Sequence, residues 1–317
     1  GDKGIEGVVV SDGVETAVTD KNGVYQLSSK KKHGYVFVSV PRGYEVPLNV
    51  VFPQIHKYLT KSASAAERVD FELKEVQNPD NYTMLICGDI HLANRFNDRE
   101  QFSHFLEDVK EFVTANGGNI YGLTLGDMVW DRYWVDNNYS FPEYIEEMKP
   151  LTGLPFFQTP GNHDHDLWES GDFATMAKYK QNIGPSYYSY NLGKVHGVVL
   201  DDIDCANPGT GKNATYTNNL VQEQLDWLKK DLSHVSKDTP IIVSMHAQMF
   251  ANPGTGQTPN YAMTASSASQ LEDILDDFTT VHIFTGHTHK MYNVDRTLTK
   301  NGIYEHNAGA VCATWWV

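Results

Sequence analysis

Residues 83–91 read TMLICGDIH: an apolar run that ends at a glycine and is followed by an aspartate and a histidine. A short apolar run bounded by a turn residue is typical of a buried strand. Apolar residues between positions 102 and 113 then recur with the 3.6-residue period of a helix, which Asp98 can cap and Gly117-Gly118 can end. The sequence around this stretch therefore passes from a strand into a helix.

The alternation of predicted strands and helices continues along the rest of the chain. Apolar stripes predict two later helices, one over Val221–Leu232 and one over Leu271–Phe278. Further strands are predicted at residues 121–125, 155–158, 195–200, 241–245 and 281–284. Strands that alternate with helices indicate an α/β domain.

Residues 1–77 lack helical periodicity and predict a small all-β sandwich that precedes the α/β domain. Short alternating runs occur at Gly7–Val10, Val24–Leu27 and Tyr35–Val40. The polar, turn-rich stretch Asn78–Asn81 marks the change of rhythm. We therefore expect two domains, one over residues 1–77 and one over residues 78–317.

The 317 residues carry 25 Lys and Arg against 40 Asp and Glu, a net charge of 25 − 40 = −15. Proteins that bind a nucleic-acid backbone present clustered Lys and Arg, so this balance argues against such a partner. It is compatible with a phosphorylated small molecule, lipid or sugar phosphate as substrate, because bound divalent metals reverse the field of an acidic site. No apolar run in the sequence is long enough to span a bilayer. The oligomeric state is left open.

Polar residues that suit metal binding follow the ends of five predicted strands. They are Asp89 with His91, Asp127, Asn162 with His163 and Asp164, His246, and His287 with His289. In open α/β sheets, sites assemble beyond the carboxyl ends of the strands, so five loops are expected to bring these groups into one pocket. Glycines precede these residues at positions 88, 126, 161 and 286 and permit tight turns and a close approach of the backbone.

Carboxylate, imidazole and amide oxygen are all ligands of divalent transition metals such as Mn, Fe and Zn. No cysteine joins this set, which argues against a structural zinc site. Cys87 is interpreted as a small core residue, and a pairing of Cys205 with Cys312 is left open. A single such motif is common, and His246 taken alone would be a core histidine. The ordered set of five indicates a metal site.

Two features close to these motifs receive a simpler interpretation. His165 and Asp166 follow the Asn162 motif and are expected on a solvated loop. The aromatic clusters at residues 130–134 and 187–190 are as often core or rim packing as pocket lining. These residues are therefore left out of the predicted site, apart from Asp131, to which we return below.

The five motifs Gly88–His91, Gly126-Asp127, Gly161–Asp164, His246 and Gly286–His289 resemble, in the same order, the motif series of calcineurin-like metallophosphoesterases. The resemblance covers about residues 83–310 and implies two β-sheets sandwiched between helices. The first domain is similar to the β-sandwich that precedes the catalytic domain in one bacterial branch of the family. That analogy implies a secreted or periplasmic location and a non-catalytic role for residues 1–77.

The resemblance also implies a role for each residue. Asp89, His91 and His289 would hold one divalent metal ion, and Asn162, His246 and His287 would hold a second. Asp127 would bridge the two ions, and a hydroxide between them would attack phosphorus. His163 would face the substrate, where it could protonate the leaving oxygen or stabilise the charge of the transition state.

Two positions depart from the patterns of related groups. Purple acid phosphatases place a metal-binding tyrosine three residues after the bridging aspartate, where this chain has Trp130, so an Fe(III)–tyrosinate chromophore is not expected. Protein phosphatases of the family have an aspartate at the same offset that orients the catalytic histidine. Here the nearest candidate is Asp131, one residue later, which we assign as the partner of His163.

The expected reaction is hydrolysis of a phosphomonoester or a phosphodiester, and the residues do not choose between the two. One alternative is a pyrophosphatase-type cleavage of a nucleotide-diphosphate substrate. The other is a non-catalytic protein that holds metal or phosphate. The sequence loses no ligand position, and this favours the enzyme.

Overall fold

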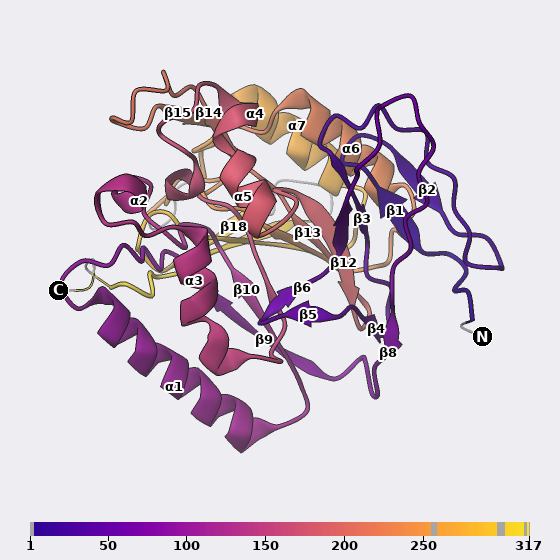
Figure 1. Ribbon diagram of the computed structural model, residues 1–317, viewed down its shortest axis with the longest axis horizontal. Helices are drawn as coiled ribbons and strands as arrows, with labels where there is room; N and C mark the ends of the chain where they lie inside the picture. The colour runs from indigo at the N-terminus through magenta and orange to yellow at the C-terminus, as the bar shows by residue number, and fades with distance from the viewer. Residues whose placement is uncertain (1–2, 255–258, 297–301, 314–315, 317) are drawn as a thin grey trace.

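The computed structural model describes residues 3–254, 259–296, 302–313 and 316. Two β-sheets form the centre of the molecule, and helices lie on opposite sides of the pair of sheets (Figure 1). The N-terminal β region lies at one end of the molecule, beside α6 and β12 (Figure 1). This arrangement confirms the predicted class, an antiparallel β region followed by an α/β domain.

The smaller sheet contains the strand that opens the α/β domain. It has the order β11-β10-β9, with β9 at Tyr82–Cys87, β10 at Asn119–Thr124 and β11 at Phe156–Phe157, and all its pairings are parallel. Helices α1 (Asp98–Asn116) and α3 (Phe141–Glu147) pack on its outer face through a cluster that includes Phe102, Phe141 and Phe156.

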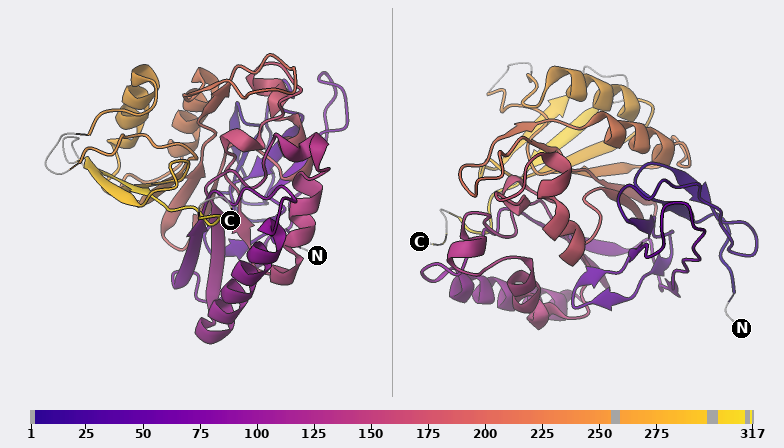
Figure 2. Two further views of the ribbon diagram at one scale, coloured as in Figure 1. Left: turned by 90° about the vertical axis from the view of Figure 1, so that its left-hand side faces the viewer. Right: turned by 45° about the horizontal axis from the view of Figure 1, so that its top comes forward.

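The larger sheet has six strands. Their order is β12 (Tyr188–Leu192), β13 (Val195–Val199), β16 (Ile241–Ser244), β17 (Val281–Thr285), β19 (Ile303–Asn307) and β18 (Tyr292–Arg296). The four central strands run parallel, and β12 and β18 are antiparallel edges. Helices α6 (Gln222–Leu232) and α7 (Ala265–Leu275) lie against its outer face (Figure 2).

The inner faces of the two sheets form one apolar layer. The ring of Phe157 on β11 stacks on that of Tyr190 on β12, with centroids 4.0 Å apart. Leu123 on β10 belongs to the same core as Val243 on β16. Burial of this layer fixes the two sheets relative to each other, which aligns the carboxyl ends of their parallel strands.

Shorter elements occupy the connections. They are α2 (Tyr133–Asp136), η1 (Lys149–Leu151), η2 (Asn162–Asp164), α4 (Asp172–Thr175), α5 (Ala177–Asn182), β14 (Ile203–Cys205) and β15 (Tyr216–Asn218). Among the described helices, none combines the length and the apolarity that crossing a bilayer requires.

The N-terminal region is antiparallel throughout. A four-stranded sheet has the order β2 (Thr16–Val18), β1 (Val9–Ser11), β3 (Tyr35–Val38) and β7 (His56–Tyr58). Two short pairs complete it, β4 (Tyr44–Glu45) with β8 (Lys74–Glu75) and β5 (Leu48–Asn49) with β6 (Phe52–Pro53). The strand predicted at Val24–Leu27 is wrong. The backbone of Val24 bonds to Asp20 in a turn instead of joining a ladder.

This region shares a hydrophobic core with the α/β domain. Trp227 on α6 is fully buried, its ring packs edge-on against Phe37 at 6.0 Å, and its indole N–H donates to the Ser11 hydroxyl at 3.0 Å. Ser189 on β12 bonds to Ser39 at 2.9 Å. The boundary near residue 77 stays a prediction, because these contacts cross it.

The predicted helices are present, with two corrections at their ends. Helix α1 ends at Gly117 as expected, but its N-cap residue is Asn97, so the capping role assigned to Asp98 is wrong. The Asp98 carboxylate accepts the N–H groups of Ala93 and Arg95 at 2.9 and 3.0 Å and thereby orders the loop that follows His91. Helix α7 ends at Leu275, and Phe278 is buried beyond it.

Replacement of Trp227 by alanine should destabilise the whole chain by about 3–5 kcal/mol, because it opens a cavity in the shared core. We expect urea unfolding followed by circular dichroism to show one transition at a lower midpoint. Phe112→Ala, which removes a partly exposed ring on α1, should change stability by about 0.5 kcal/mol or less. Two separate transitions would contradict a shared core.

The buried His56 should make the chain sensitive to acid. Burial, assisted by the charge of Lys57, lowers its pKa to about 4. The neutral ring is favoured in the folded state, so this contribution to stability is complete above about pH 6.5 and is lost as the pH falls towards 4. His56→Phe should flatten the acid limb of a stability–pH curve, whereas His104→Phe on the exposed side of α1 should leave that limb unchanged.

Candidate metal centre

The structure brings all seven predicted ligand residues together at the carboxyl ends of the parallel strands. Those that follow β9, β10 and β11 in the smaller sheet are Asp89, His91, Asp127 and Asn162. Those that follow β16 and β17 in the larger sheet are His246, His287 and His289. The site therefore lies where the two sheets meet.

One group of ligand atoms surrounds His91. Its Nε2 lies 3.1 Å from Nε2 of His289 and 3.7 Å from Oδ1 of Asp89. The same Asp89 oxygen lies 3.3 Å from Nε2 of His289. Asp89 and His91 are fully buried, so water does not compete with these contacts.

A second group surrounds His246. Its Nε2 lies 3.0 Å from Oδ1 of Asn162 and 3.1 Å from Nδ1 of His287. Its Nδ1 donates to the carbonyl of Leu125 at 2.7 Å, which leaves Nε2 as the nitrogen with a lone pair that faces the group. This second contact fixes the tautomer that a metal ligand requires.

Asp127 joins the two groups. One of its oxygens, Oδ2, lies 3.5 Å from Nε2 of His91 and 3.1 Å from Nε2 of His246. Two ligand atoms that each lie ~2.1 Å from one ion are separated by ~3.0–3.4 Å. Five of the seven separations are 3.0–3.3 Å and match that geometry, and the two from His91 to Asp89 and Asp127 are longer, at 3.7 and 3.5 Å. Both groups therefore offer ligand atoms at distances close to those around a divalent ion.

The charges of the groups support the same interpretation. Burial would raise the pKa of Asp127, but the facing histidines His246, His163 and His91 hold it well below its ordinary value. Burial would lower the pKa of His246, yet Asp127 raises it to about 10. The Asp127 carboxylate is therefore ionised, as a metal ligand must be. Its charge attracts a proton to the facing histidines when no metal ion is present.

The backbone carries strain at the same place. Five of the seven candidate ligand residues have a left-handed backbone: Asp89, His91, Asp127, His287 and His289, with φ of 50–64°. Such conformations are uncommon for residues other than glycine and cluster at functional sites, where the surrounding fold offsets their cost. The strain turns these side chains towards the pocket.

His163 and Asp131 lie beside the two groups. The His163 N–H donates to Oδ1 of Asp127 at 2.8 Å, and its ring Nδ1 lies 2.8 Å from Oδ1 of Asp131. A carboxylate only accepts, so Nδ1 is the donor and Nε2 is free to act towards the pocket. Burial opposes protonation, but the charge of Asp127 and the bond to Asp131 raise the pKa of His163.

Residues 82–291 match the model of the calcineurin-like phosphoesterase family, and residues 1–76 match the model described as the N-terminal part of calcineurin-like phosphoesterase. The chain belongs to the calcineurin-like phosphoesterase family. Its two ligand groups, joined by one aspartate, are consistent with the dimetal sites of that family.

Within this family the chain is distantly related to purple acid phosphatases. It is 25% identical over 252 residues to purple acid phosphatase 15 of Arabidopsis thaliana and 22% identical over 257 residues to purple acid phosphatase 13 of the same plant. These matches cover 69% and 71% of this chain, but only 42% and 43% of the two plant proteins.

A solved structure shares the fold. The purple acid phosphatase from seeds of yellow lupin (Lupinus luteus) superposes with a TM-score of 0.50 at 13% sequence identity. The superposition covers 72% of this chain and 44% of that one. The chain thus spans less than half the length of each of these three purple acid phosphatases.

Trp130 stands at the position where the purple acid phosphatase pattern has a metal-binding tyrosine. Its ring centroid lies 5.6 Å from that of His91 and 5.5 Å from that of His163. An indole offers no lone pair to a metal. The residue therefore shapes the wall of the pocket, and the absence of a tyrosinate chromophore stays a prediction.

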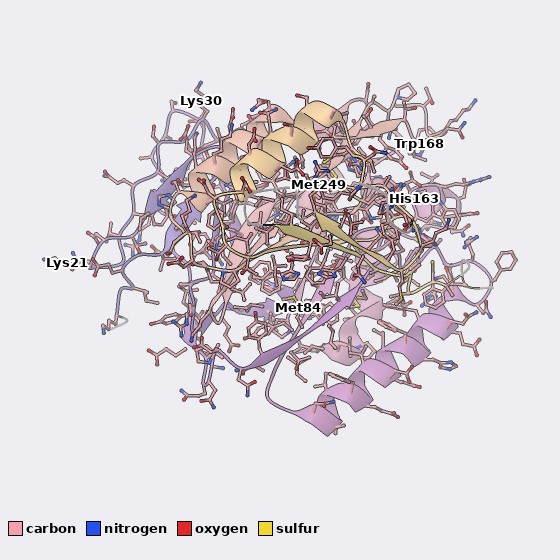
Figure 3. All side chains as sticks on the ribbon, turned by 180° about the vertical axis from the view of Figure 1, so that it is seen from behind. Lys21, Lys30, Met84, His163, Trp168 and Met249 are labelled. Atoms are coloured by element: carbon pink, nitrogen blue, oxygen red, sulfur yellow. The ribbon has the colours of Figure 1, made fainter. Side chains whose placement is uncertain are left out.

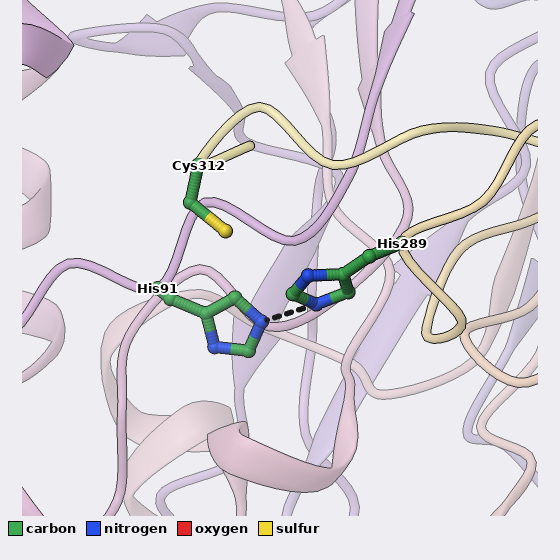
Figure 4. A group of neighbouring side chains, drawn as sticks. All are labelled: His91, His289 and Cys312. Atoms are coloured by element: carbon green, nitrogen blue, oxygen red, sulfur yellow. Dashed lines mark hydrogen bonds between the residues drawn. The ribbon is translucent and has the colours of Figure 1, made fainter. Parts of the chain in front are cut away.

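Cys312 lies beside the predicted ligand set, although the sequence did not single it out. Its Sγ and ligand nitrogens of His91 and His289 all lie within 4.8 Å of one another (Figure 4). The backbone N–H of Cys312 donates to the Asp89 carbonyl at 3.2 Å, which places the segment against the first motif. All three cysteines are free, so the pairing of Cys205 with Cys312 that was left open is not formed.

Two buried aspartates position the ligands. The sequence placed Asp164 in the third motif without assigning it a role, and it did not single out Asp202. Asp164 accepts the backbone N–H groups of Asp127 and Gly161 at 2.8 Å each, and so holds two ligand loops together. Asp202 accepts the N–H of His246 at 2.9 Å. Asp202 follows the strand predicted at residues 195–200, so the rule that found the other clusters could have found it.

Gly161 and Gly286 serve the close packing that was predicted for them. A side chain on Gly161 would overlap the backbone and carboxylate of Asp127, and one on Gly286 would meet Oδ2 of Asp89. His165 and Asp166 are buried, so the expectation of a solvated loop is wrong for them.

Proposed function

We propose that this chain hydrolyses phosphate esters at a centre of two divalent metal ions. In this proposal Asp89, His91 and His289 hold one ion, Asn162, His246 and His287 hold the other, and Asp127 holds both. The observation that carries the proposal is the shared carboxylate oxygen of Asp127, which lies within 3.5 Å of a histidine from each group. Mn, Fe and Zn all suit this mixture of ligands.

The two ions, when bound, would supply a nucleophilic water at neutral pH and would neutralise charge on the phosphoryl oxygens. The residues of the chain determine where the substrate lies. A cavity of about 360 Å³ opens over the centre and is lined by Asp127, Asn162, His163, Tyr216, His287, Thr288 and His289. The phosphoryl group would occupy this cavity, which we call the phosphoryl cavity.

His163 would provide the proton for the leaving oxygen. Its Nδ1 is held by Asp131, so the opposite nitrogen of the ring faces the phosphoryl cavity that His163 lines. Burial opposes protonation, but Asp127 and Asp131 raise the pKa of His163, which favours the protonated ring that a general acid requires. Asp131 acts through His163 and is a positioning residue.

The N-terminal region is proposed to be non-catalytic. The residues that form the two ligand groups and the His163–Asp131 pair all come from the part of the chain after β9. Lys21 and Lys30 of the N-terminal region lie at the opposite end of the molecule from His163 (Figure 3). The region would therefore affect activity only through the stability of the shared core.

The first test combines metal analysis with hydrolysis of nitrophenyl phosphate and bis-nitrophenyl phosphate. About two ions per chain are expected, with activity that chelation removes and Mn restores, and the faster ester would identify the substrate class. Asp127→Asn should lower metal content and reduce turnover by more than about 100-fold, because one carboxylate serves both ions. Full metal loading with normal turnover in that variant would refute the bridging role.

Other results of this test would favour the alternatives. Bound metal without hydrolysis of either ester would favour a non-catalytic metal or phosphate binder. Turnover of a nucleotide diphosphate alone would favour the pyrophosphatase reaction.

His163→Ala should keep both ions and lose about 10²–10⁴-fold in rate, with the largest loss for esters whose leaving groups are poor. Asp131→Asn should reduce the rate by a smaller factor. It should also shift the alkaline limb of the rate–pH profile to lower pH, because it removes the bond that raises the pKa of His163. Loss of metal from His163→Ala would show instead that His163 is a ligand.

A further inference from the structure

A second cavity adjoins the metal centre on the side of His163. It encloses about 420 Å³, which is within the range of small-molecule sites. It shares His163 with the phosphoryl cavity, and its walls include Trp130 and Trp168. We call it the side cavity. His163 and Trp168 are neighbours on the same side of the molecule (Figure 3).

Trp130 forms the wall nearest the metal centre and is held by its neighbours. The guanidinium of Arg95 lies over its ring, 4.3 Å from the centroid. Tyr133 packs edge-on against it at 5.3 Å. Both contacts favour one orientation of the indole, because cation–π and edge-to-face pairs are geometrically specific.

Trp168 forms another wall and is 53% exposed, although a large apolar ring loses free energy in contact with water. Its ring lies directly on Gly211, where a side chain would overlap it. The backbone N–H of Gly211 donates to the carbonyl of Leu167 at 2.9 Å. Two loops distant in the sequence thus hold the ring in place.

These loops are anchored by buried polar groups. The Asp166 carboxylate accepts the N–H of Trp168 at 2.9 Å and pairs with Lys178 at 3.0 Å. The Asn207 side chain accepts the N–H of Thr215 at 2.8 Å. Asp166 and Asn207 are both buried, so the wall is preorganised before any ligand binds.

Two exposed cations, Arg132 and Lys212, complete the lining. Neither forms an ion pair with another residue in the part of the chain that the structure describes. Asp136 also lines the cavity and offsets part of their charge, while Asp131 is engaged by His163. In a chain with a net charge of −15, these cations create a local preference for an anion.

We propose that the side cavity binds the leaving group of the substrate and selects one that has both a planar aromatic ring and a further negative charge. The ring would lie against Trp168 and Trp130, and the charge would face Arg132 and Lys212. Nucleotides that carry a second phosphate group are a class of phosphate ester that combines these features, and mononucleotides offer the ring alone. This inference rests on the proposed function, because the phosphoryl group must lie at the metal centre for the leaving group to reach the cavity.

The ring preference is tested with AMP and ribose 5-phosphate, which have the same phosphorylated hydroxyl and differ in the base. The metal-loaded protein should have a higher kcat/KM for AMP, and Trp168→Ala should reduce the ratio of the two values by about ten-fold, as expected for the loss of one stacking surface. Trp168→Phe should restore most of the ratio. Phe112→Ala, a matched loss of an exposed ring on α1, should leave it unchanged.

The charge preference is tested with adenosine 3′,5′-bisphosphate against AMP. The metal-loaded protein should have a higher kcat/KM for the bisphosphate than for AMP. Replacement of both Arg132 and Lys212 by glutamine should remove this difference in kcat/KM. The same double variant should leave the ratio of kcat/KM for AMP to kcat/KM for ribose 5-phosphate unchanged. An unchanged advantage in the double variant would overturn the role of the two cations.

A binding measurement separates this inference from the proposed function. Calorimetry with AMP and with ribose 5-phosphate on the metal-loaded protein needs no turnover. Suppose that neither ester is hydrolysed, but AMP binds more tightly than ribose 5-phosphate and Trp168→Ala abolishes this difference in affinity. The proposed function then fails and the subsite stands. Equal binding of the two ligands, or equal loss of both in Trp168→Ala, would overturn the subsite.

Discussion

The buried carboxylate of Asp127, set between imidazoles from two groups, is the constraint on which the rest of the site depends. A charge removed from water is tolerated only when it is paired and hydrogen-bonded. Here His91 and His246 face one oxygen, and the backbone of His163 donates to the other. The backbone N–H of Asp127 in turn binds the buried Asp164. The left-handed residues around the pocket persist because this network of bonds determines their conformation.

The two-sheet architecture supplies the positions for that network. Parallel strands end at one edge, so the loops after β9, β10 and β11 meet those after β16 and β17 where the inner faces are packed together. The N-terminal region stabilises the larger sheet from one end, through Trp227 and Ser189, and leaves the opposite end open. The contacts that stabilise the larger sheet and the candidate ligand residues therefore lie at different ends of one hydrophobic core.

In the proposed function, the metal centre would bind the phosphoryl group and the side cavity would select the leaving group. The candidate ligands lie at strand ends, and such a centre would suit any phosphoryl group. The side cavity is formed by loops, with Trp168 against Gly211 and the buried Asp166 beneath it. Loops vary more readily than strand ends, so a family can keep one reaction and change its substrate through such a wall. The free Cys312 lies beside His91 and His289 at the same centre.

The sequence by itself determined the class of fold and the candidate ligands that the structure brings together, because both depend on local pattern. Apolar periods located β9 and α1, and the rule that sites follow strand ends selected all seven ligand candidates. The tertiary structure decided what depends on contacts between distant segments. Val24–Leu27 has the period of a strand but joins none of the ladders among the residues that the structure describes. Asp202, Cys312 and the Trp168 wall act through residues far away in the chain. Sequence spacing does not record such contacts, since they arise only when the two sheets pack.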